Sequence, residues 1–370
     1  MIRKILKGCI LSVFAISILL YLVPSPAANV EGTRLYIRQD DLIGTKPIFF
    51  ALTGNGTLVG WGGDSGHMFR GIRDGFGSPY VMRKVLAKNV KDFACGIYNG
   101  MYIDEDSQLW GWGANAGLLF AERDVVYNDA VKIMEDVQSV AIGRDHAAAI
   151  KTDGTLWTWG RNLQGQLGIG TKGEKDGHII DEGKYYEPQK IMENVQGIYI
   201  LEDNITFAVA GNNELYVWGN GTICSPHKIA ENIQTVDIAA IRRNGTTFQC
   251  LTTTGEIYLF DLYAEDFEAQ FDKSTLYNAK SICRDGVIKE DDSLWKWEVS
   301  EDEHRLVEVE KNVACAAADF YLTDSGKLFV NSPMSVMPKP VATVVPYLRN
   351  GVILLCGALL IACKRNKEAV

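Results

Sequence analysis

One short aromatic pattern occurs seven times along the chain. The segment from Leu156 to Gly160 reads LWTWG, and equivalent segments begin at Leu58, Leu109, Leu215, Ile257, Leu294 and Leu328. A pair of turn-forming residues precedes each of them, such as Asp153-Gly154 in front of LWTWG. Such pairs close two-residue β-hairpins, because Gly, Asn and Asp tolerate the left-handed backbone that these turns require. The sequence therefore predicts one β-hairpin in each of seven repeats.

The repeats fill residues 31–332 and show little helical periodicity. A single small sheet cannot bury both of its faces, but seven sheets around one axis bury each other and close a ring. The pattern therefore predicts an all-β fold, a seven-bladed β-propeller, with an open β-solenoid as the alternative. The last repeat, residues 312–332, has room for three strands, so residues 31–38 are expected to supply the strand that closes the last blade.

The third repeat adds a longer signature to its aromatic segment. Trp159-Gly160 is followed by Asn162 and by Gly165-Gln166-Leu167-Gly168, and the core of this pattern recurs at Trp61-Gly62, Trp112-Gly113 and Trp218-Gly219. The pattern resembles the repeats of the regulator of chromosome condensation family, in particular its secreted bacterial members. The resemblance implies a seven-bladed propeller in which Trp61, Gly62, Trp112, Gly113, Trp159, Gly160, Asn162, Gly165, Trp218 and Gly219 have structural roles. Repeats five to seven depart from it, because they lack the glycine.

Both ends of the chain are apolar. Residues 1–30 begin with three basic residues and continue with an uncharged apolar run, which predicts a signal peptide or an uncleaved N-terminal anchor helix. After a linker, residues 333–343, the stretch 344–363 is long enough to be a transmembrane helix, although its shorter apolar part also fits a buried or interfacial helix. The basic tail, residues 364–370, is then expected to be cytoplasmic and the propeller extracellular.

Charge and motif content exclude several classes of function. The formal net charge is -9, and the two ends contribute +3 each, which leaves -15 for residues 31–340. Nucleic-acid binding requires Lys and Arg that replace counterions along the phosphates, so no nucleic-acid partner is expected. The five histidines and eight cysteines lack the spacing of a metal site, and no nucleophile motif occurs. We therefore expect no metal, no cofactor and no catalytic residues.

The least repetitive feature is an insertion after the third aromatic segment, from Ile169 to Pro188. Insertions in repeat proteins lie in loops, and loops carry binding more often than the scaffold does. Tyrosines would supply rigid contact area, and acidic groups would attract a basic partner. The candidate binding residues are Glu174, Asp176, His178, Asp181, Glu182, Tyr185 and Tyr186. The alternative is an exposed insertion without a role.

These features predict an extracellular, membrane-anchored binding module that recognises a protein or a cell-wall glycan. The first alternative is a propeller enzyme, a lyase or hydrolase, with its site at the mouth of the channel. The second is a structural spacer of the cell envelope. The resemblance implies a binding function, because secreted members of that family look like binding proteins. It therefore favours the binding module over the enzyme and the spacer.

Overall fold

The computed structural model describes residues 34–38, 48–62, 81–96, 99–114, 126–175, 178–179, 186–201, 204–242, 245–262, 272–273, 278–299, 304–317, 320–325, 328–330 and 339–341. The chain divides into two compact units, one formed by residues 32–318 and the other by residues 1–31 together with 319–370. Regular structure within the described ranges consists of β-strands. The prediction of an all-β fold is therefore confirmed for these residues.

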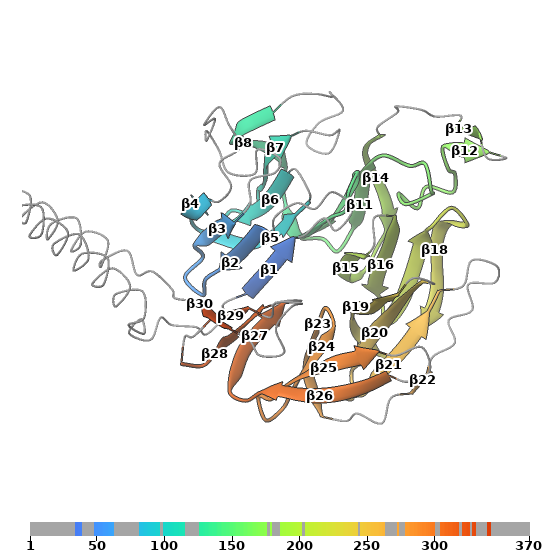
Figure 1. Cartoon of the computed structure of the whole chain (residues 1–370). Coiled ribbons are helices and arrows are strands. Elements are labelled where there is room, and N and C mark those ends of the chain that lie inside the picture. The colour runs from blue at the N-terminus through green and yellow to red at the C-terminus, as the bar shows by residue number, and fades with distance from the viewer. Residues whose placement is uncertain are drawn as a thin grey trace, which may run out of the picture. The chain divides into compact units, whose positions relative to one another are not determined.

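The unit 32–318 contains six four-stranded antiparallel sheets (Figure 1). The first sheet has the order β1 (Arg34–Arg38), β2 (Ile48–Leu52), β3 (Leu58–Gly62), β4 (Val81–Ala87). The second has β5 (Val90–Cys95), β6 (Asn99–Asp104), β7 (Leu109–Ala114), β8 (Val126–Met134). The third has β9 (Val137–Ile142), β10 (His146–Lys151), β11 (Leu156–Gly160) and, after the insertion, β14 (Tyr186–Met192).

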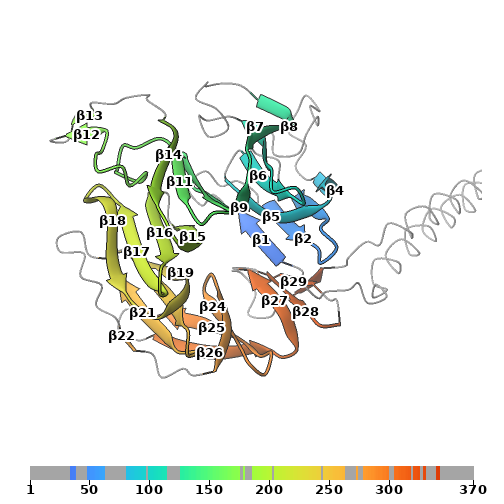
Figure 2. The same ribbon diagram turned by 180° about the vertical axis from the view of Figure 1, so that it is seen from behind.

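The other three sheets of this unit repeat the same order. The fourth has β15 (Val195–Leu201), β16 (Ile205–Ala210), β17 (Glu214–Gly219), β18 (Ile223–Ala230). The fifth has β19 (Ile233–Arg242), β20 (Gly245–Thr252), β21 (Ile257–Asp261), β22 (Asp272–Lys273). The sixth has β23 (Ala279–Cys283), β24 (Gly286–Lys289), β25 (Leu294–Val299), β26 (His304–Glu310). From the second sheet to the sixth, the first strand of each sheet contacts the first strand of the next one, as expected of propeller blades (Figure 2).

The last four strands follow in the order β27-β28-β29-β30. The first of them, β27 (Val313–Ala317), belongs to the unit 32–318, where it contacts β1 and β24. The remaining three, β28 (Phe320–Thr323), β29 (Leu328–Val330) and β30 (Lys339–Val341), belong to the other unit. Because β27 contacts β1, the two ends of the unit 32–318 meet, which excludes the open solenoid for this part of the chain.

The predicted hairpins are confirmed, but the predicted two-residue connection is wrong: in the third sheet three residues, 152–154, lie between Lys151 and Thr155, and the Lys151 N–H donates to the Thr155 carbonyl. Each aromatic segment forms the third strand of its sheet. In the third sheet, for example, β10 pairs with β11 from His146↔Gly160 to Ile150↔Leu156 across the turn at Asp153-Gly154. Gly154 adopts a φ of +79°, the left-handed conformation that this turn requires. These hairpins form from local contacts, which is why their sequence signal is strong.

A second turn joins each sheet to the next one. Its central residue is an Asn or Asp with a φ between +56° and +65°: Asn89, Asp136, Asn194, Asn232, Asn278 and Asn312. The following residue donates its N–H to the hairpin turn of the preceding sheet, as from Val137 to the Ser107 carbonyl at 2.8 Å and from Val195 to Gly154 at 2.9 Å. All hairpin turns of the unit 32–318 therefore lie on one face, which we call the turn face. The connections from first to second strands lie on the opposite face, which we call the loop face.

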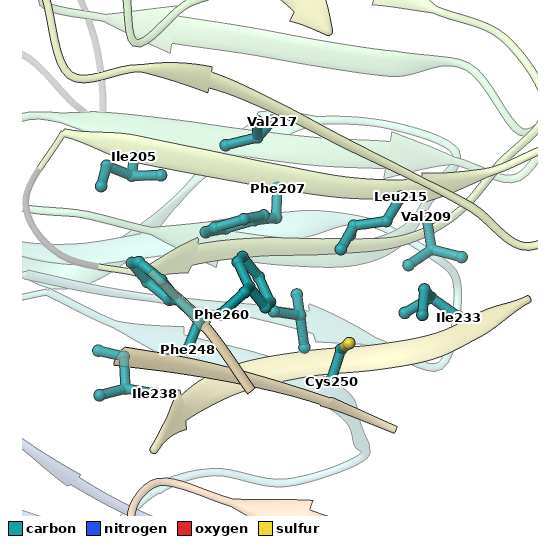
Figure 3. Close-up of a cluster of buried hydrophobic side chains, with 11 residues drawn as sticks. Ile205, Phe207, Val209, Leu215, Val217, Ile233, Ile238, Phe248, Cys250 and Phe260 are labelled. Carbon is teal, nitrogen blue, oxygen red and sulfur yellow. The ribbon is translucent and has the colours of Figure 1, made fainter. Parts of the chain in front are cut away.

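Apolar side chains fill the space between neighbouring sheets. Between the fourth and fifth sheets, Phe207, Phe248 and Phe260 are buried, with ring centroids 5.1 Å apart for Phe207 and Phe248 and 5.5 Å apart for Phe248 and Phe260 (Figure 3). Burial of one such side chain stabilises the fold by roughly 1.5–3 kcal/mol. The sheets are therefore held face to face by their cores as well as by the turns.

The prediction that residues 31–38 close the last blade is wrong for residues 34–38, which form β1. β1 pairs with β2 from Arg34↔Leu52 to Arg38↔Ile48 and is the first strand of the first sheet. Tyr36 explains this placement: its ring lies 6.1 Å from that of Phe93, and its hydroxyl donates to the Cys95 carbonyl at 2.8 Å. The strand beside β29 is instead β30, from a segment that the sequence assigned to the linker.

The predicted membrane segments, residues 1–30 and 344–363, lie outside the described residues, as does the tail 364–370. Within the described ranges, no helix has the length and apolar character needed to cross a bilayer.

Candidate functional site

The insertion leaves and re-enters the propeller on the loop face of the third sheet. The chain leaves β11 at Gly160 and returns as β14, which pairs with β11 from Gly160↔Tyr186 to Leu156↔Met192. Between them a small hairpin forms, in which β12 (Glu174–Lys175) pairs with β13 (His178–Ile179). Of the candidate binding residues, Glu174, His178 and Tyr186 thus lie in strands. The other four, Asp176, Asp181, Glu182 and Tyr185, lie outside the described residues.

A closed loop, residues 162–173, forms the base of this insertion, and Asn162 holds it together. The Asn162 side chain is buried, donates from Nδ2 to the Thr171 carbonyl at 2.8 Å and accepts the Leu167 N–H at 3.0 Å. Its own carbonyl accepts the Gly173 N–H at 2.8 Å. One asparagine thereby fixes the middle and the end of the loop, which is the structural role expected from the signature. We call this loop the platform.

The platform is fastened to the fourth sheet through the backbone carbonyl of Gln166. This carbonyl accepts the indole N–H of Trp218 at 2.9 Å and the hydroxyl of Thr206 at 3.1 Å, and both of these side chains are fully buried. Further bonds run from Gly170 N–H to the Cys224 carbonyl at 2.7 Å and from Gly221 N–H to the Gln164 carbonyl at 2.8 Å. Because the partners are rigid backbone and buried side chains, the base of the insertion has little freedom to move.

The remaining signature residues serve packing and backbone geometry. Trp112, Trp159 and Trp218 are buried. The glycines that follow them, Gly113, Gly160 and Gly219, have φ angles of +97°, +101° and +105°. Trp61 stacks on Phe49 with the ring centroids 5.6 Å apart, Gly62 ends β3, and a Cβ on Gly165 would lie 2.8 Å from the Cys224 Sγ. In repeats five and six the glycine is replaced by Asp261 and Glu298, neither of which has a positive φ.

His146 lies behind the platform as a buried, neutral side chain. Its Nε2 is 2.9 Å from the Thr206 Oγ1. Because the Thr206 hydroxyl donates its proton to Gln166, it can only accept from His146, so Nε2 carries the proton. Burial lowers the pKa of His146 to about 3. A packing role for this histidine, rather than that of a general base, follows from this environment.

The burial of His146 makes the stability of the protein depend on pH. Its pKa is about 3 in the folded protein, and a free histidine titrates near 6.5. Between these values only the unfolded chain binds the proton, so the free energy of unfolding falls as the pH decreases, by about 1.4 kcal/mol per pH unit. From pH 7 to pH 5 the wild type should lose about 2 kcal/mol more than His146→Gln in urea unfolding. Burial raises the pKa of Asp237 to about 6, but this residue is present in both proteins, so its contribution to the pH dependence cancels in the comparison. Equal losses would contradict the burial of a neutral His146.

Charged side chains line the loop face beside the platform. Arg161 donates its backbone N–H to the Asp145 carbonyl at 2.8 Å, and its guanidinium lies 3.6 Å from the Asp145 carboxylate. Burial raises the pKa of Asp145, and Arg161 opposes this shift. Across the described ranges, no three His, Cys, Asp or Glu side chains are grouped so that they could hold a metal.

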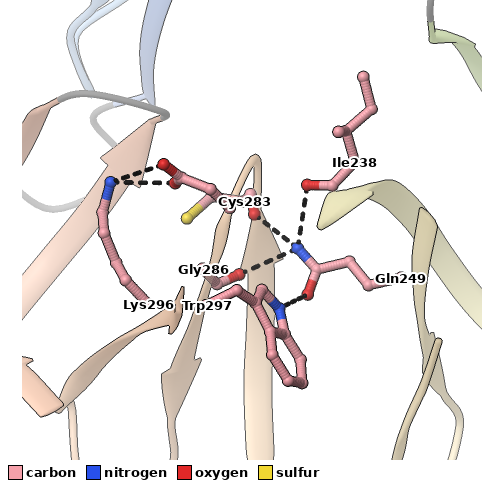
Figure 4. Close-up of polar contacts among 7 residues, drawn as sticks. Ile238, Gln249, Cys283, Gly286, Lys296 and Trp297 are labelled. Atoms are coloured by element: carbon pink, nitrogen blue, oxygen red, sulfur yellow. Dashed lines mark hydrogen bonds and ion pairs between the residues drawn. The ribbon is translucent and has the colours of Figure 1, made fainter. Parts of the chain in front are cut away.

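A second sheet-to-sheet joint lacks any signature motif in the sequence. Gln249 of the fifth sheet is fully buried and donates to the carbonyls of Cys283 at 2.7 Å and Gly286 at 3.2 Å in the sixth (Figure 4). Its Oε1 accepts the indole N–H of Trp297 at 2.9 Å. Trp297 is the second aromatic residue of its segment, as Trp218 is. The joint is therefore recognised from the burial of Gln249 and its bond to Trp297, and not from a motif in the sequence.

Comparisons with known proteins agree with the repeat pattern. Residues 137–166 match one model of the Regulator of chromosome condensation (RCC1) repeat, and residues 153–213 match a second model of the same repeat. The RCC1 domain-containing protein RUG3, mitochondrial, of Arabidopsis thaliana is 27% identical over 182 residues, which are 46% of this chain and 39% of that protein. The Ultraviolet-B receptor UVR8 of the same plant is 26% identical over 186 residues, with the same shares. The match thus spans well under two thirds of either relative.

Two solved structures also resemble the chain. Human WBSCR16 has a TM-score of 0.49 and 17% identity over 68% of this chain and 69% of that chain. Prp20p of Saccharomyces cerevisiae has a TM-score of 0.47 and 16% identity over 62% of this chain and 61% of that chain. The repeat matches cover the third sheet, the platform, and the first two strands of the fourth sheet, β15 and β16. Residues 137–213 therefore match models of the RCC1 repeat, and the part of the chain that the structure describes is an all-β propeller.

Proposed function

We propose that the protein is a membrane-anchored, extracellular binding module that recognises a partner protein through its insertion. RCC1-repeat propellers are in general protein-interaction scaffolds, and the chain shares their repeats. The observation that carries the proposal is the platform. It provides a base whose hydrogen bonds are made to backbone and to buried side chains of the next sheet. Binding loops on rigid scaffolds lose less conformational entropy on association than free loops do.

The direction in which the chain enters the propeller supports the same assignment. Arg34, the first residue of β1, pairs with Leu52 at the turn face. The insertion emerges after Gly160, at the loop face. The insertion and the start of β1 therefore lie on opposite faces of the unit 32–318, so the first strand does not obstruct the insertion.

The composition of the insertion indicates the chemistry of the partner. Residues 174–186 contain four acidic residues, two lysines and two adjacent tyrosines. Acidic groups accelerate the approach of a basic surface, and tyrosine gives rigid contact area at little cost in side-chain entropy. We therefore propose a protein with a basic binding surface, and treat a cell-wall glycan as the alternative outcome of the test.

The same proposal includes a seventh blade, formed by residues 313–341. The order β27-β28-β29-β30 supports it, because it matches the strand order of the six complete sheets. The contact of β27 with β1 supports it as well, since β27 then follows β23 as the next first strand around the axis.

Affinity capture of the full chain tests the binding function and the site together. In the first variant Glu174, Asp176, Asp181 and Glu182 are changed to amides. In the control, four exposed acids elsewhere, Glu290, Glu298, Glu308 and Asp324, are changed in the same way. We expect the wild type and the control to capture one partner reproducibly and the insertion variant to capture at least tenfold less. Equal capture by both variants would refute the site, and capture of no partner by the wild type would refute the function.

The location is tested with a membrane-impermeant amine reagent on intact cells. Lys172 of the platform is exposed and should be labelled without permeabilisation. Labelling that requires opened cells would rule out an extracellular propeller.

A further inference from the structure

An aromatic side chain recurs at one position of the third strand, next to the turn face. It is the residue after the first apolar residue of each segment, and it is partly exposed in Trp110, Trp157, Tyr216, Tyr258 and Trp295. The polar edge of each ring is bonded to its own hairpin turn. The Nε1 of Trp157 donates to the Thr155 hydroxyl at 2.9 Å, for example, and the Trp295 Nε1 donates to the Ser293 hydroxyl at 2.8 Å. The rings are therefore held in fixed and equivalent orientations.

In two of the sheets a lysine of the same chain lies over the ring. Lys151 Nζ is 5.8 Å from the centroid of Trp157, and Lys289 Nζ is 3.9 Å from the centroid of Trp295. Each lysine stands six residues before its tryptophan, where the second strand ends. A cation over an aromatic face is attracted by the negative face of the ring. This position in the repeat therefore binds an ammonium group in two independent cases.

The second sheet has the same ring but a different residue at the lysine position. Six residues before Trp110 stands Asp104, whose Oδ2 accepts the Trp110 indole N–H at 2.7 Å. Its Oδ1 accepts the N–H groups of Asp106 and Gln108 at 3.0 and 2.9 Å, so the turn is as well fixed as its counterparts. The site around Trp110 thus combines a fixed ring with a carboxylate where the third and sixth sheets supply a lysine.

The other neighbours of the ring are the same in the second and third sheets. The cross-strand partner is Lys132 for Trp110 and Lys190 for Trp157. Each of these lysines is paired with a glutamate three residues later, Glu135 and Glu193. The two sites therefore share the ring and its cross-strand lysine, and they differ at the end of the second strand, where one has Asp104 and the other has Lys151.

We propose that Trp110 binds a lysine or arginine side chain from a basic segment of a partner protein, at the position that Lys151 and Lys289 fill in their own sheets. The adjacent turns, residues 104–108 and 135–136, contain five acidic residues. Two lysines contact these turns: Lys91 donates to the Ser107 hydroxyl at 3.2 Å, and Lys132 is paired with Glu135. Glu105 and Asp106 are exposed there, so a segment with several cations would be attracted along its length. The site lies on the turn face, opposite the insertion, and does not depend on the function proposed for that insertion.

The test uses the full chain and a synthetic peptide of alternating lysine and glycine, with a glutamate–glycine peptide as the control ligand. In the main variant residues 104–109 are replaced by the sequence of residues 151–156, Lys-Thr-Asp-Gly-Thr-Leu. This graft supplies the ring with its own lysine and retains a complete set of turn hydrogen bonds. Calorimetry should give at least tenfold weaker binding of the lysine peptide to the graft and to Trp110→Leu than to the wild type. The glutamate peptide should not bind.

A reverse graft and a fold control complete the experiment. Replacing residues 151–156 by the sequence of residues 104–109 should create a second site and double the stoichiometry. The amide variant of the insertion should bind the peptide as the wild type does, which separates this proposal from the previous one. The thermal unfolding midpoint shows that each graft is folded. Unchanged peptide affinity in the folded 104–109 graft, or no binding to the wild type, would overturn the proposal.

Discussion

Gln249→Leu should lower the free energy of unfolding by about 3–5 kcal/mol, since each buried polar group left without a partner costs about 1–3 kcal/mol. The substitution leaves the Cys283 and Gly286 carbonyls and the Trp297 indole N–H without the partner they have now. Leucine is close to glutamine in size, so the loss arises from unmet hydrogen bonds and not from a cavity. Urea unfolding followed by tryptophan fluorescence measures it.

Two further variants separate this explanation from a general effect of substitution. Gln189→Leu changes an exposed glutamine that donates only to the neighbouring carbonyls of Glu187 and Pro188, and it should shift stability by less than about 0.5 kcal/mol. The double variant Gln249→Leu, Trp297→Phe removes the indole N–H as well and should recover part of the loss. A loss below about 1 kcal/mol for Gln249→Leu would contradict the role of Gln249 as the joint between the fifth and sixth sheets.

The sequence predicts the hairpins and third strands well because their causes are local. A turn pair such as Asp153-Gly154 and the alternation after it act within ten residues, and the structure confirms both. The platform is also visible in the sequence, since Asn162 and Gln166 belong to the longest motif. Its partner is not visible. That the Gln166 carbonyl faces Thr206 and Trp218 depends on the next sheet, in which these residues lie 40 and 52 residues further along the chain.

The errors at the ends of the propeller have a different cause. The strand of residues 34–38 has no repeat motif, so its place depends on tertiary contacts of Tyr36 with the first and second sheets. The sequence does contain a signal that marks where the first strand of each later sheet begins. An Asn or Asp with positive φ stands immediately before it, as Asn89 stands before Val90 and Asp136 before Val137. No such residue precedes Arg34, which separates this strand from the repeated first strands.

The tryptophan–glycine signature is explained by the backbone, and the strongest test of this explanation is Gly219→Ala. Gly219 has a φ of +105°, and a Cβ added there would lie 2.0 Å from the Asn204 carbonyl oxygen. Alanine can relieve this overlap only if the end of β17 moves away from β16. We expect a loss of about 4 kcal/mol or more in the free energy of unfolding, well above the cost of a strained φ alone.

Gly211→Ala provides the matched control for Gly219→Ala, because it places the same substitution in the same sheet. Gly211 also has a positive φ, +57°, but its added Cβ would meet only the Glu214 carboxylate, at 3.7 Å. That variant should lose about 1 kcal/mol, the cost of a left-handed conformation for a residue with a Cβ. Chemical denaturation of both variants gives the difference directly. If the two losses are equal, steric contact with Asn204 does not explain why position 219 requires glycine. The similar φ angles of Gly113, Gly160 and Gly219 would then need another explanation.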